Sequence, residues 1–168
     1  MTILLQEQQP LANTRRDVLA PGSANEPSQP CTDCGLATEG RACEMQHAYR
    51  STGGIISGDE LAQRLRCRSD QPISLLARWI VTGRIVHFEW RCQTWIPLFQ
   101  FNLAEMDLVP GVHQVVAELR DAFDDWELTQ WFARPNCWLR GGSPSEVIEA
   151  DPQSVFEVAR ADRFVAMG

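Results

Sequence analysis

The 168-residue sequence contains no lysine, because all 15 of its basic residues are arginine. Without lysine the chain cannot form a Schiff base or supply the lysine of a phosphate-binding P-loop. Its three histidines also leave few general bases for catalysis at neutral pH. The sequence has no Gly-x-Ser-x-Gly turn and no His-Glu-x-x-His pair. We therefore expect a protein that is not an enzyme.

Long apolar runs are missing as well, so no segment is predicted to span a membrane. The first residues contain a short apolar stretch but lack the basic flank of a signal peptide. We therefore expect a cytoplasmic protein whose six cysteines are reduced thiols. The apolar content of 44% and the six tryptophans are sufficient for a hydrophobic core.

Charge is unevenly distributed along the chain, whose net charge of −7 argues against a generic nucleic-acid binder. Residues 51–101 carry six arginines and four acidic residues, whereas residues 102–168 carry five arginines and twelve acidic residues. The mildly basic middle could meet DNA, and the acidic end could complement a basic protein partner. Solvated surfaces would explain both charge patterns equally well.

The N-terminal part divides at about residue 30. Residues 1–30 are rich in Gln, Pro, Ser and Asn and show no apolar period, which predicts a disordered tail. Residues 31–50 carry the ligand types of a tetrahedral Cys₃His zinc site, in the spacing C-x₂-C-x₈-C-x₃-H. Zinc would explain how so polar a segment folds, and the alternative is that it binds no metal. The candidate ligands are Cys31, Cys34, Cys43 and His47.

Two short helices are predicted next. Ser57 and Glu60 have the spacing of a capping box that begins the first helix. Pro72 lies near the first turn of the second helix, which should end at Gly83. The apolar residues expected to face the core from this second helix are Ile73, Leu76 and Ile80.

A β-hairpin should follow the helix pair. Residues 85–90 and 94–101 are rich in β-branched and aromatic residues and are separated by three residues. Together with the two helices they predict a small winged helix-turn-helix over residues 53–101. The side chains expected to face operator DNA are Ser74, Arg78, Thr82, Arg84 and Arg91.

Residues 108–168 are predicted to form a four-helix module, two of whose helices are short. Capping signals at Asp124, Ser143 and Asp151 begin the last three helices, and proline follows the second and third of these caps. The fold class is therefore mainly α. The first helix of the module carries one apolar face, formed by Val112, Val115, Val116, Leu119 and Phe123.

This C-terminal stretch resembles the toxin-binding domain of the MbcA/ParS/Xre antitoxin family. The likeness rests on the pattern WFxxPNxxLxGGSP at residues 131–144, on Val147-Ile148 and on a helix after Asp151-Pro152. It implies an all-helical antitoxin that neutralises a RES-type toxin, an enzyme that degrades NAD, by blocking its active site. Residues 57–101 resemble an excisionase/MerR-type winged helix, through the pattern LARWIxxG at residues 76–83.

The resemblance implies a set of partner-binding residues. Trp131 could lie in the core instead of binding a partner, because its spacing is helical. Trp138 lies in a loop and is equally consistent with core and interface. Self-association is also expected, because a single helix-turn-helix makes few phosphate contacts and a homodimer doubles them. The alternative functions are a solitary DNA-binding regulator or adaptor that uses this module to dimerise, and a zinc-dependent adaptor. The implied partner-binding residues are Trp131, Pro135, Asn136, Trp138, Leu139, Gly141 and Gly142.

Overall fold

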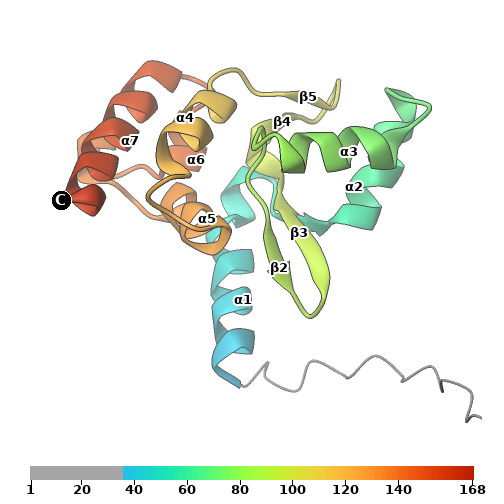
Figure 1. The fold of residues 1–168 in the computed structure, drawn as a ribbon, viewed down its shortest axis with the longest axis horizontal. Coiled ribbons are helices and arrows are strands. Elements are labelled where there is room, and N and C mark those ends of the chain that lie inside the picture. The colour runs from blue at the N-terminus through green and yellow to red at the C-terminus, as the bar shows by residue number, and fades with distance from the viewer. Residues whose placement is uncertain (1–35) are drawn as a thin grey trace, which may run out of the picture. The chain divides into compact units, whose positions relative to one another are not determined.

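The structure, a computed structural model, describes residues 36–168 (Figure 1). The tail predicted over residues 1–30 lies outside the described residues, as do Cys31 and Cys34. Within residues 36–168 the chain is mainly helical, with a three-stranded antiparallel sheet and a two-stranded one, which confirms the mainly α prediction. No helix in this range is long and apolar enough to cross a membrane.

The segment expected as a zinc knuckle contains a helix that the sequence analysis did not predict. This helix is α1 (Leu36–Ala48), and over residues 40–48, where burial is described, its buried residues are Ala42 and Met45. A short 3₁₀ turn, η1 (Arg50–Thr52), follows it. Tyr49, the only tyrosine of the chain, is fully buried between them, and its hydroxyl donates a 2.7 Å hydrogen bond to the carbonyl of Thr129.

The predicted helix pair is present. Ser57 Oγ accepts a 3.2 Å hydrogen bond from Glu60 N at the start of the first helix, and proline occupies the first turn of the second. Residues 65–71 separate the two helices: the first three form a 3₁₀ turn, and residues 68–71 lead into the second helix. The elements are β1 (Ile55–Ser57), α2 (Gly58–Arg64), the 3₁₀ turn η2 (Leu65–Cys67) and α3 (Pro72–Val81).

The buried face of α3 differs from the expected one. Leu76 and Trp79 are its buried residues, whereas the side chain of Ile73 is 74% exposed. Trp79 packs against Phe101 at 5.9 Å between ring centroids. Because the large side chain of Trp79 occupies the core-facing side of α3, Ile73 in the first turn of the helix faces solvent. The expectation that Ile73 faces the core was therefore wrong.

The predicted hairpin is present but shorter than expected. It consists of β2 (Phe88–Trp90) and β3 (Gln93–Pro97), joined by Arg91 and Cys92, which both adopt left-handed backbone conformations. β1 pairs with the other edge of β3, so the strand order is β1-β3-β2. After β3 the chain turns through the 3₁₀ turn η3 (Leu98–Gln100) and forms a small ribbon, β4 (Phe101–Asn102) with β5 (Asp107–Leu108).

Four helices follow, as predicted. Reciprocal capping boxes at Asp124 and Ser143 begin the second and third, and Asp151 caps the fourth. The first and fourth lie side by side (Figure 1). They are α4 (Val112–Leu119), α5 (Asp125–Ala133), α6 (Pro144–Val147) and α7 (Pro152–Met167), with the 3₁₀ turn η4 (Cys137–Leu139) between α5 and α6.

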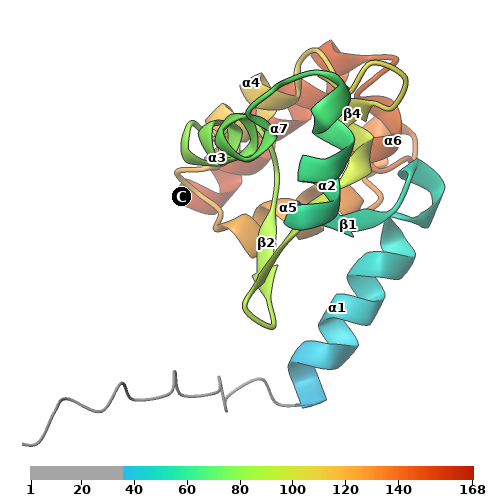
Figure 2. The ribbon, with the colours of Figure 1, turned by 90° about the vertical axis from the view of Figure 1, so that its right-hand side faces the viewer.

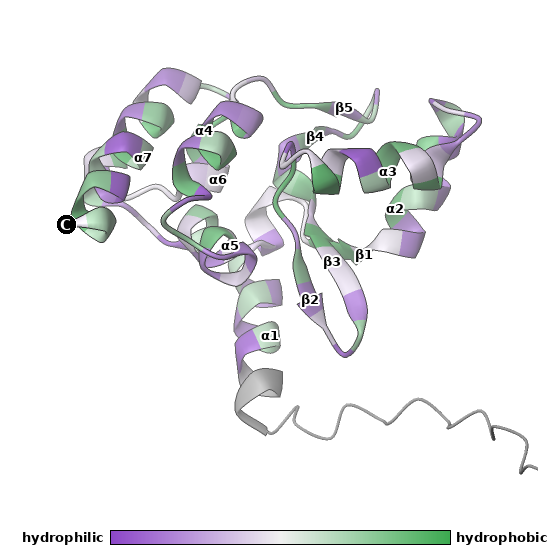
Figure 3. Cartoon of the chain, viewed as in Figure 1, coloured by the Kyte–Doolittle hydropathy of each residue, from purple (hydrophilic) through white to green (hydrophobic). Residues whose placement is uncertain are grey.

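The larger of two hydrophobic clusters crosses the expected boundary between the winged unit and the C-terminal module. Val86, Phe88 and Phe99 belong to it together with the buried residues of α4, α5 and α7. A smaller cluster fills the space between α2, α3 and the sheet. Figure 2 shows α1 and the hairpin from a second side. Figure 3 shows where apolar residues lie along the ribbon. The two expected modules therefore share one core.

A buried amide joins the hairpin to the turn that follows it. The side chain of Gln100 is fully buried, with its Oε1 accepting from Val86 N at 2.7 Å. Its Nε2 donates to the carbonyls of Val86 and Pro97, both at 2.8 Å. Every polar atom of this side chain is thus paired, which buried amides require.

Candidate functional site

The loop between α5 and α6 is closed by one residue, Asn136. Its Oδ1 accepts from the backbone N of Trp138 at 2.9 Å, and its carbonyl accepts from Leu139 N and Gly141 N. Its own N–H donates to the carbonyl of Gly142 at 3.0 Å. These four hydrogen bonds hold residues 136–142 as a tight turn. The loop is therefore a preformed surface rather than one that must order on contact.

Trp138 lies on the outside of this loop. Its side chain is 77% exposed, whereas that of the adjacent Leu139 is 6% exposed and belongs to the main core. Leu139 thus anchors the loop from inside and presents Trp138 to solvent. The structure does not place Leu139 where a partner could contact it, because its side chain is enclosed by the protein's own core. It acts as a positioning residue.

The glycines of the loop serve its geometry. Gly141 has φ +83°, a left-handed conformation that side chains with a Cβ rarely adopt. A Cβ at Gly142 would lie 3.1 Å from Cγ2 of Val147, so α6 packs closely on the loop. Both residues therefore shape the turn that carries Trp138.

Trp131 joins α5 to α7. Its side chain is half-buried, and its Nε1 donates a 2.8 Å hydrogen bond to Asp162 Oδ2. Trp131, Pro135 and Asn136 line one groove of about 330 Å³, beside the carboxylates of Glu127 and Asp162. The structure therefore brings three of the seven predicted partner-binding residues together in an aromatic groove, which two carboxylates and the guanidinium of Arg134 also line.

Hydrogen bonds keep two carboxylates of the module ionised. The pKa of Glu146 is lowered by hydrogen bonds from Ser143, through its backbone N–H and its hydroxyl, and from the Ser51 hydroxyl. The pKa of Asp151 is lowered by the hydroxyl and the backbone N–H of Ser154. The negative charge of this end of the chain therefore persists below neutral pH.

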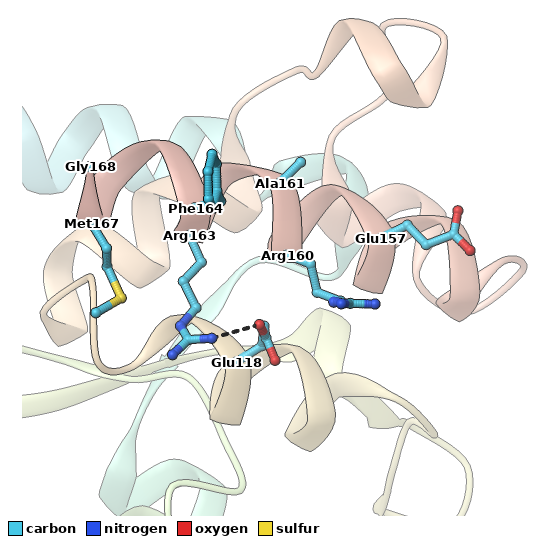
Figure 4. A pocket seen from close by; sticks show the side chains of 8 residues that line it. All are labelled: Glu118, Glu157, Arg160, Ala161, Arg163, Phe164, Met167 and Gly168. Carbon is cyan, nitrogen blue, oxygen red and sulfur yellow. Dashed lines mark hydrogen bonds and ion pairs between the residues drawn. The ribbon is translucent and has the colours of Figure 1, made fainter.

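A second groove, of about 640 Å³, lies between α4 and the end of α7 (Figure 4). Arg163 Nη1 contacts Glu118 Oε1 at 3.2 Å across it, and Phe164 stands at its edge with 79% of its side chain exposed. The sequence analysis missed this groove. The unpartnered Phe164-Val165 pair at the end of the helix is the signal that could have indicated it.

The predicted DNA-facing residues of α3 are all exposed. Ser74 and Arg78 lie one turn apart on α3, and Thr82 follows directly after it. The hydroxyl of Thr82 donates to the carbonyl of Arg78 at 2.6 Å. Arg84 is exposed two residues further along the chain. Ser74, Arg78 and Thr82 therefore follow one another at four-residue spacing from the first turn of α3 to its C-cap, and Arg84 lies just beyond that end.

Arg91 lies on the hairpin turn. Its guanidinium stacks over the ring of Trp90, 4.6 Å from the centroid. Its φ of 51° is left-handed, so the turn projects the side chain from a strained backbone. The hairpin therefore carries one exposed cation at its tip, braced by an aromatic ring.

The zinc prediction concerns residues that the structure describes only in part. Cys43 and His47 lie one turn apart on α1, and both are exposed. The other two candidate ligands are outside the described residues. Among residues 36–168 no group of three or more potential ligands comes together. The zinc site stays a prediction.

No protein-family model, no curated protein and no solved structure matches this chain. The likeness to antitoxins therefore rests on the motif residues of the α5–α6 loop and on the helices that flank it.

Proposed function

We propose that this chain is a non-catalytic, antitoxin-like protein of the cytoplasm that binds and neutralises a partner toxin through the α5–α6 loop. One observation carries the proposal: Trp138 is 77% exposed on a loop that four hydrogen bonds of Asn136 hold closed. Tryptophan is the residue type most enriched at the energetic centres of protein interfaces. A rigid loop loses little conformational entropy when such a side chain is buried by a partner.

The charge around the loop supports a basic partner surface. Glu127 and Asp162 line the adjacent groove, and the segment 102–168 carries twelve acidic residues against five arginines. Complementary charge accelerates association and selects among partners. By resemblance the partner is a RES-type toxin, whose active site the module would cover.

The test is co-expression with a RES-type toxin encoded beside the gene for this chain. The wild-type chain should restore growth and cellular NAD. Trp138→Ala should weaken the complex by about 2 kcal/mol or more, which is roughly a thirtyfold rise in Kd. Its melting temperature should stay unchanged, because the side chain contributes little buried area.

Leu103→Ala, which truncates another exposed apolar side chain, is the control and should bind as the wild type does. If Trp138→Ala lowers the melting temperature while the complex keeps its affinity, then Trp138 stabilises the fold and the proposed interface is wrong.

A second activity, operator DNA binding by a homodimer, is favoured by the order of elements in residues 36–97. A helix and a strand precede the α2–α3 pair, and the pair is followed by a hairpin whose second strand takes up β1. The 3₁₀ turn η2 continues α2, and the four residues between η2 and α3 have the length of a helix-turn-helix turn. This order supports a winged helix-turn-helix in which α3 enters the major groove.

Gel shifts on the DNA that precedes the chain's own gene test this second activity. Arg78→Ala combined with Arg84→Ala should lower affinity more than tenfold, because two phosphate or base contacts are lost. Arg140→Ala combined with Arg160→Ala changes the net charge equally on the C-terminal module and should bind nearly as well. Equal losses in both double variants would mean that net charge, and not the α3 surface, determines binding.

A further inference from the structure

Two parallel rows of side chains run along the exposed face of α3. One is polar and consists of Ser74, Arg78 and Thr82. The other is apolar and consists of Ile73, Ala77 and Val81, at the same four-residue spacing, so that the two rows are adjacent on the helix. Ile73 is 74% exposed and Val81 is 80% exposed. Contacts to phosphates alone do not explain this apolar row, because a phosphate offers no apolar group.

The apolar row borders a groove of about 340 Å³ between α3, the start of α2 and the hairpin. Ile73 and Ala77 line it from α3, and Gln93 and Thr94 line it from the hairpin. Asp59 is the only charged side chain in its lining. A carboxylate repels a phosphate, so a DNA backbone would have to pass outside this groove.

The charges beside the row select the class of partner. Within the described residues, the Arg78 and Arg84 side chains make no ion pair and no hydrogen bond. Two uncompensated cations next to an apolar row match a polyanion that offers apolar groups in its groove. The major groove of DNA accepts an α-helix, and its one apolar group is the C5-methyl of thymine, which small apolar side chains contact.

We propose that the Ile73–Ala77–Val81 row reads thymine methyl groups in the major groove, while Arg78 and Arg84 hold the helix on the strand. This inference rests on the DNA-binding part of the proposed function and deepens it. It predicts that the site bound by the chain contains thymines whose methyl groups contribute to affinity. Burial of one methyl is worth about a fourfold change in the binding constant.

Replacing thymine by uracil tests the proposal, because uracil pairs identically with adenine and lacks only the methyl group. The DNA that precedes the gene is amplified with either dTTP or dUTP, and both duplexes are titrated with the full chain. The wild-type chain should bind the uracil duplex about fifteenfold more weakly, as expected for two lost methyl contacts. Ile73→Ala combined with Val81→Ala should bind both duplexes with similar affinity.

Val165→Ala is the matched control, since Val165 is also a helical valine and is 78% exposed on α7. It should keep the wild-type ratio between the two duplexes. Both sites in α3 are largely solvent-exposed, so their truncation should leave the melting temperature unchanged.

The remaining outcomes overturn the proposal in distinguishable ways. Equal wild-type affinity for both duplexes would exclude methyl readout while leaving DNA binding intact, and so would a double variant that still discriminates. If the wild-type chain shifts neither duplex, the DNA-binding function falls together with this inference. If, in addition, Val81→Ala disrupts a dimer measured by sedimentation, the apolar row is an interface between copies of the chain.

Discussion

Single polar side chains join segments that are distant in the sequence. Gln100 pairs three backbone groups of the hairpin and its following turn, and Tyr49 reaches the carbonyl of Thr129 in α5. Asn136 differs, because its side chain accepts from the backbone of Trp138 only two residues further along the α5–α6 loop. Composition and spacing do not indicate such contacts, because their partners are backbone atoms placed by tertiary structure. Only Asn136 had a sequence signal, as part of the Pro-Asn motif.

At this scale Glu146 predicts a pH dependence. Its folded pKa lies below the ordinary value of 4.5, so the carboxylate stabilises the fold above about pH 4.5. That contribution is lost as pH falls through the lowered pKa. Glu146→Gln should reduce the free energy of unfolding at pH 7 by less than about 1 kcal/mol, because the group is exposed. The difference from the wild type should shrink toward pH 3, as followed by urea denaturation.

Glu149→Gln is the charge-matched control for this measurement. Glu149 is exposed and accepts no side-chain hydrogen bond among the described residues. Its substitution should have little effect at any pH. A Glu146→Gln difference that persists unchanged at low pH would show that the carboxylate's charge is not what stabilises the α6 cap.

Helices α4 and α7 of the C-terminal module start very close to each other, at Gly111 and Pro152. The φ of Gly111 is +90°, and a Cβ there would lie 2.7 Å from Cβ of Pro152 at the start of α7. Gly111→Ala should therefore cost about 2–4 kcal/mol, from backbone strain and from displacement of α7. Thermal or urea unfolding measures this loss.

Gly54→Ala separates the effect of backbone strain from the effect of displacing α7. Gly54 has φ +82°, and a Cβ there would meet no atom within 4 Å. This variant should lose only the strain contribution, about 1–2 kcal/mol. If both variants are equally stable, α4 and α7 are less closely packed than their helix starts indicate.

Most elements after residue 53 could be predicted from the sequence, for local reasons. The caps at Ser57, Asp124, Ser143 and Asp151 act within four residues, so their positions identify where helices begin. Helix α1 escaped prediction because its described buried residues, Ala42 and Met45, are two small or flexible side chains in a polar sequence and form no clear apolar period. The orientation of α3 was missed because the side of the helix that is buried depends on the contact between Trp79 and Phe101, which is distant in the sequence.

At the scale of the whole molecule, the larger core cluster joins the winged unit to the C-terminal module. Val86, Phe88 and Phe99 pack with the helices of the C-terminal module, so the two expected modules share the larger core cluster. The full chain should therefore unfold in a single calorimetric transition, with calorimetric and van't Hoff enthalpies equal. Residues 108–168 expressed alone should lack a cooperative transition.

Two resolved transitions in the calorimeter would contradict this expectation. So would a folded fragment of residues 108–168 with the stability of the full chain. Phe88→Ala offers an independent check, because Phe88 packs edge-on against Trp126 of α5. A loss of about 3–5 kcal/mol is expected across the single transition.

The sequence by itself determined the mainly helical class, the helix starts and the tight turn at Pro135-Asn136, since caps, prolines and glycines act on neighbouring residues. Only the tertiary structure decided that Leu139 is enclosed and Trp138 exposed, and that Ile73 and Val81 face solvent. It also decided that the hairpin and the C-terminal helices share one core. These outcomes depend on which apolar surfaces meet across the fold, and the competition for that burial is settled by all segments together.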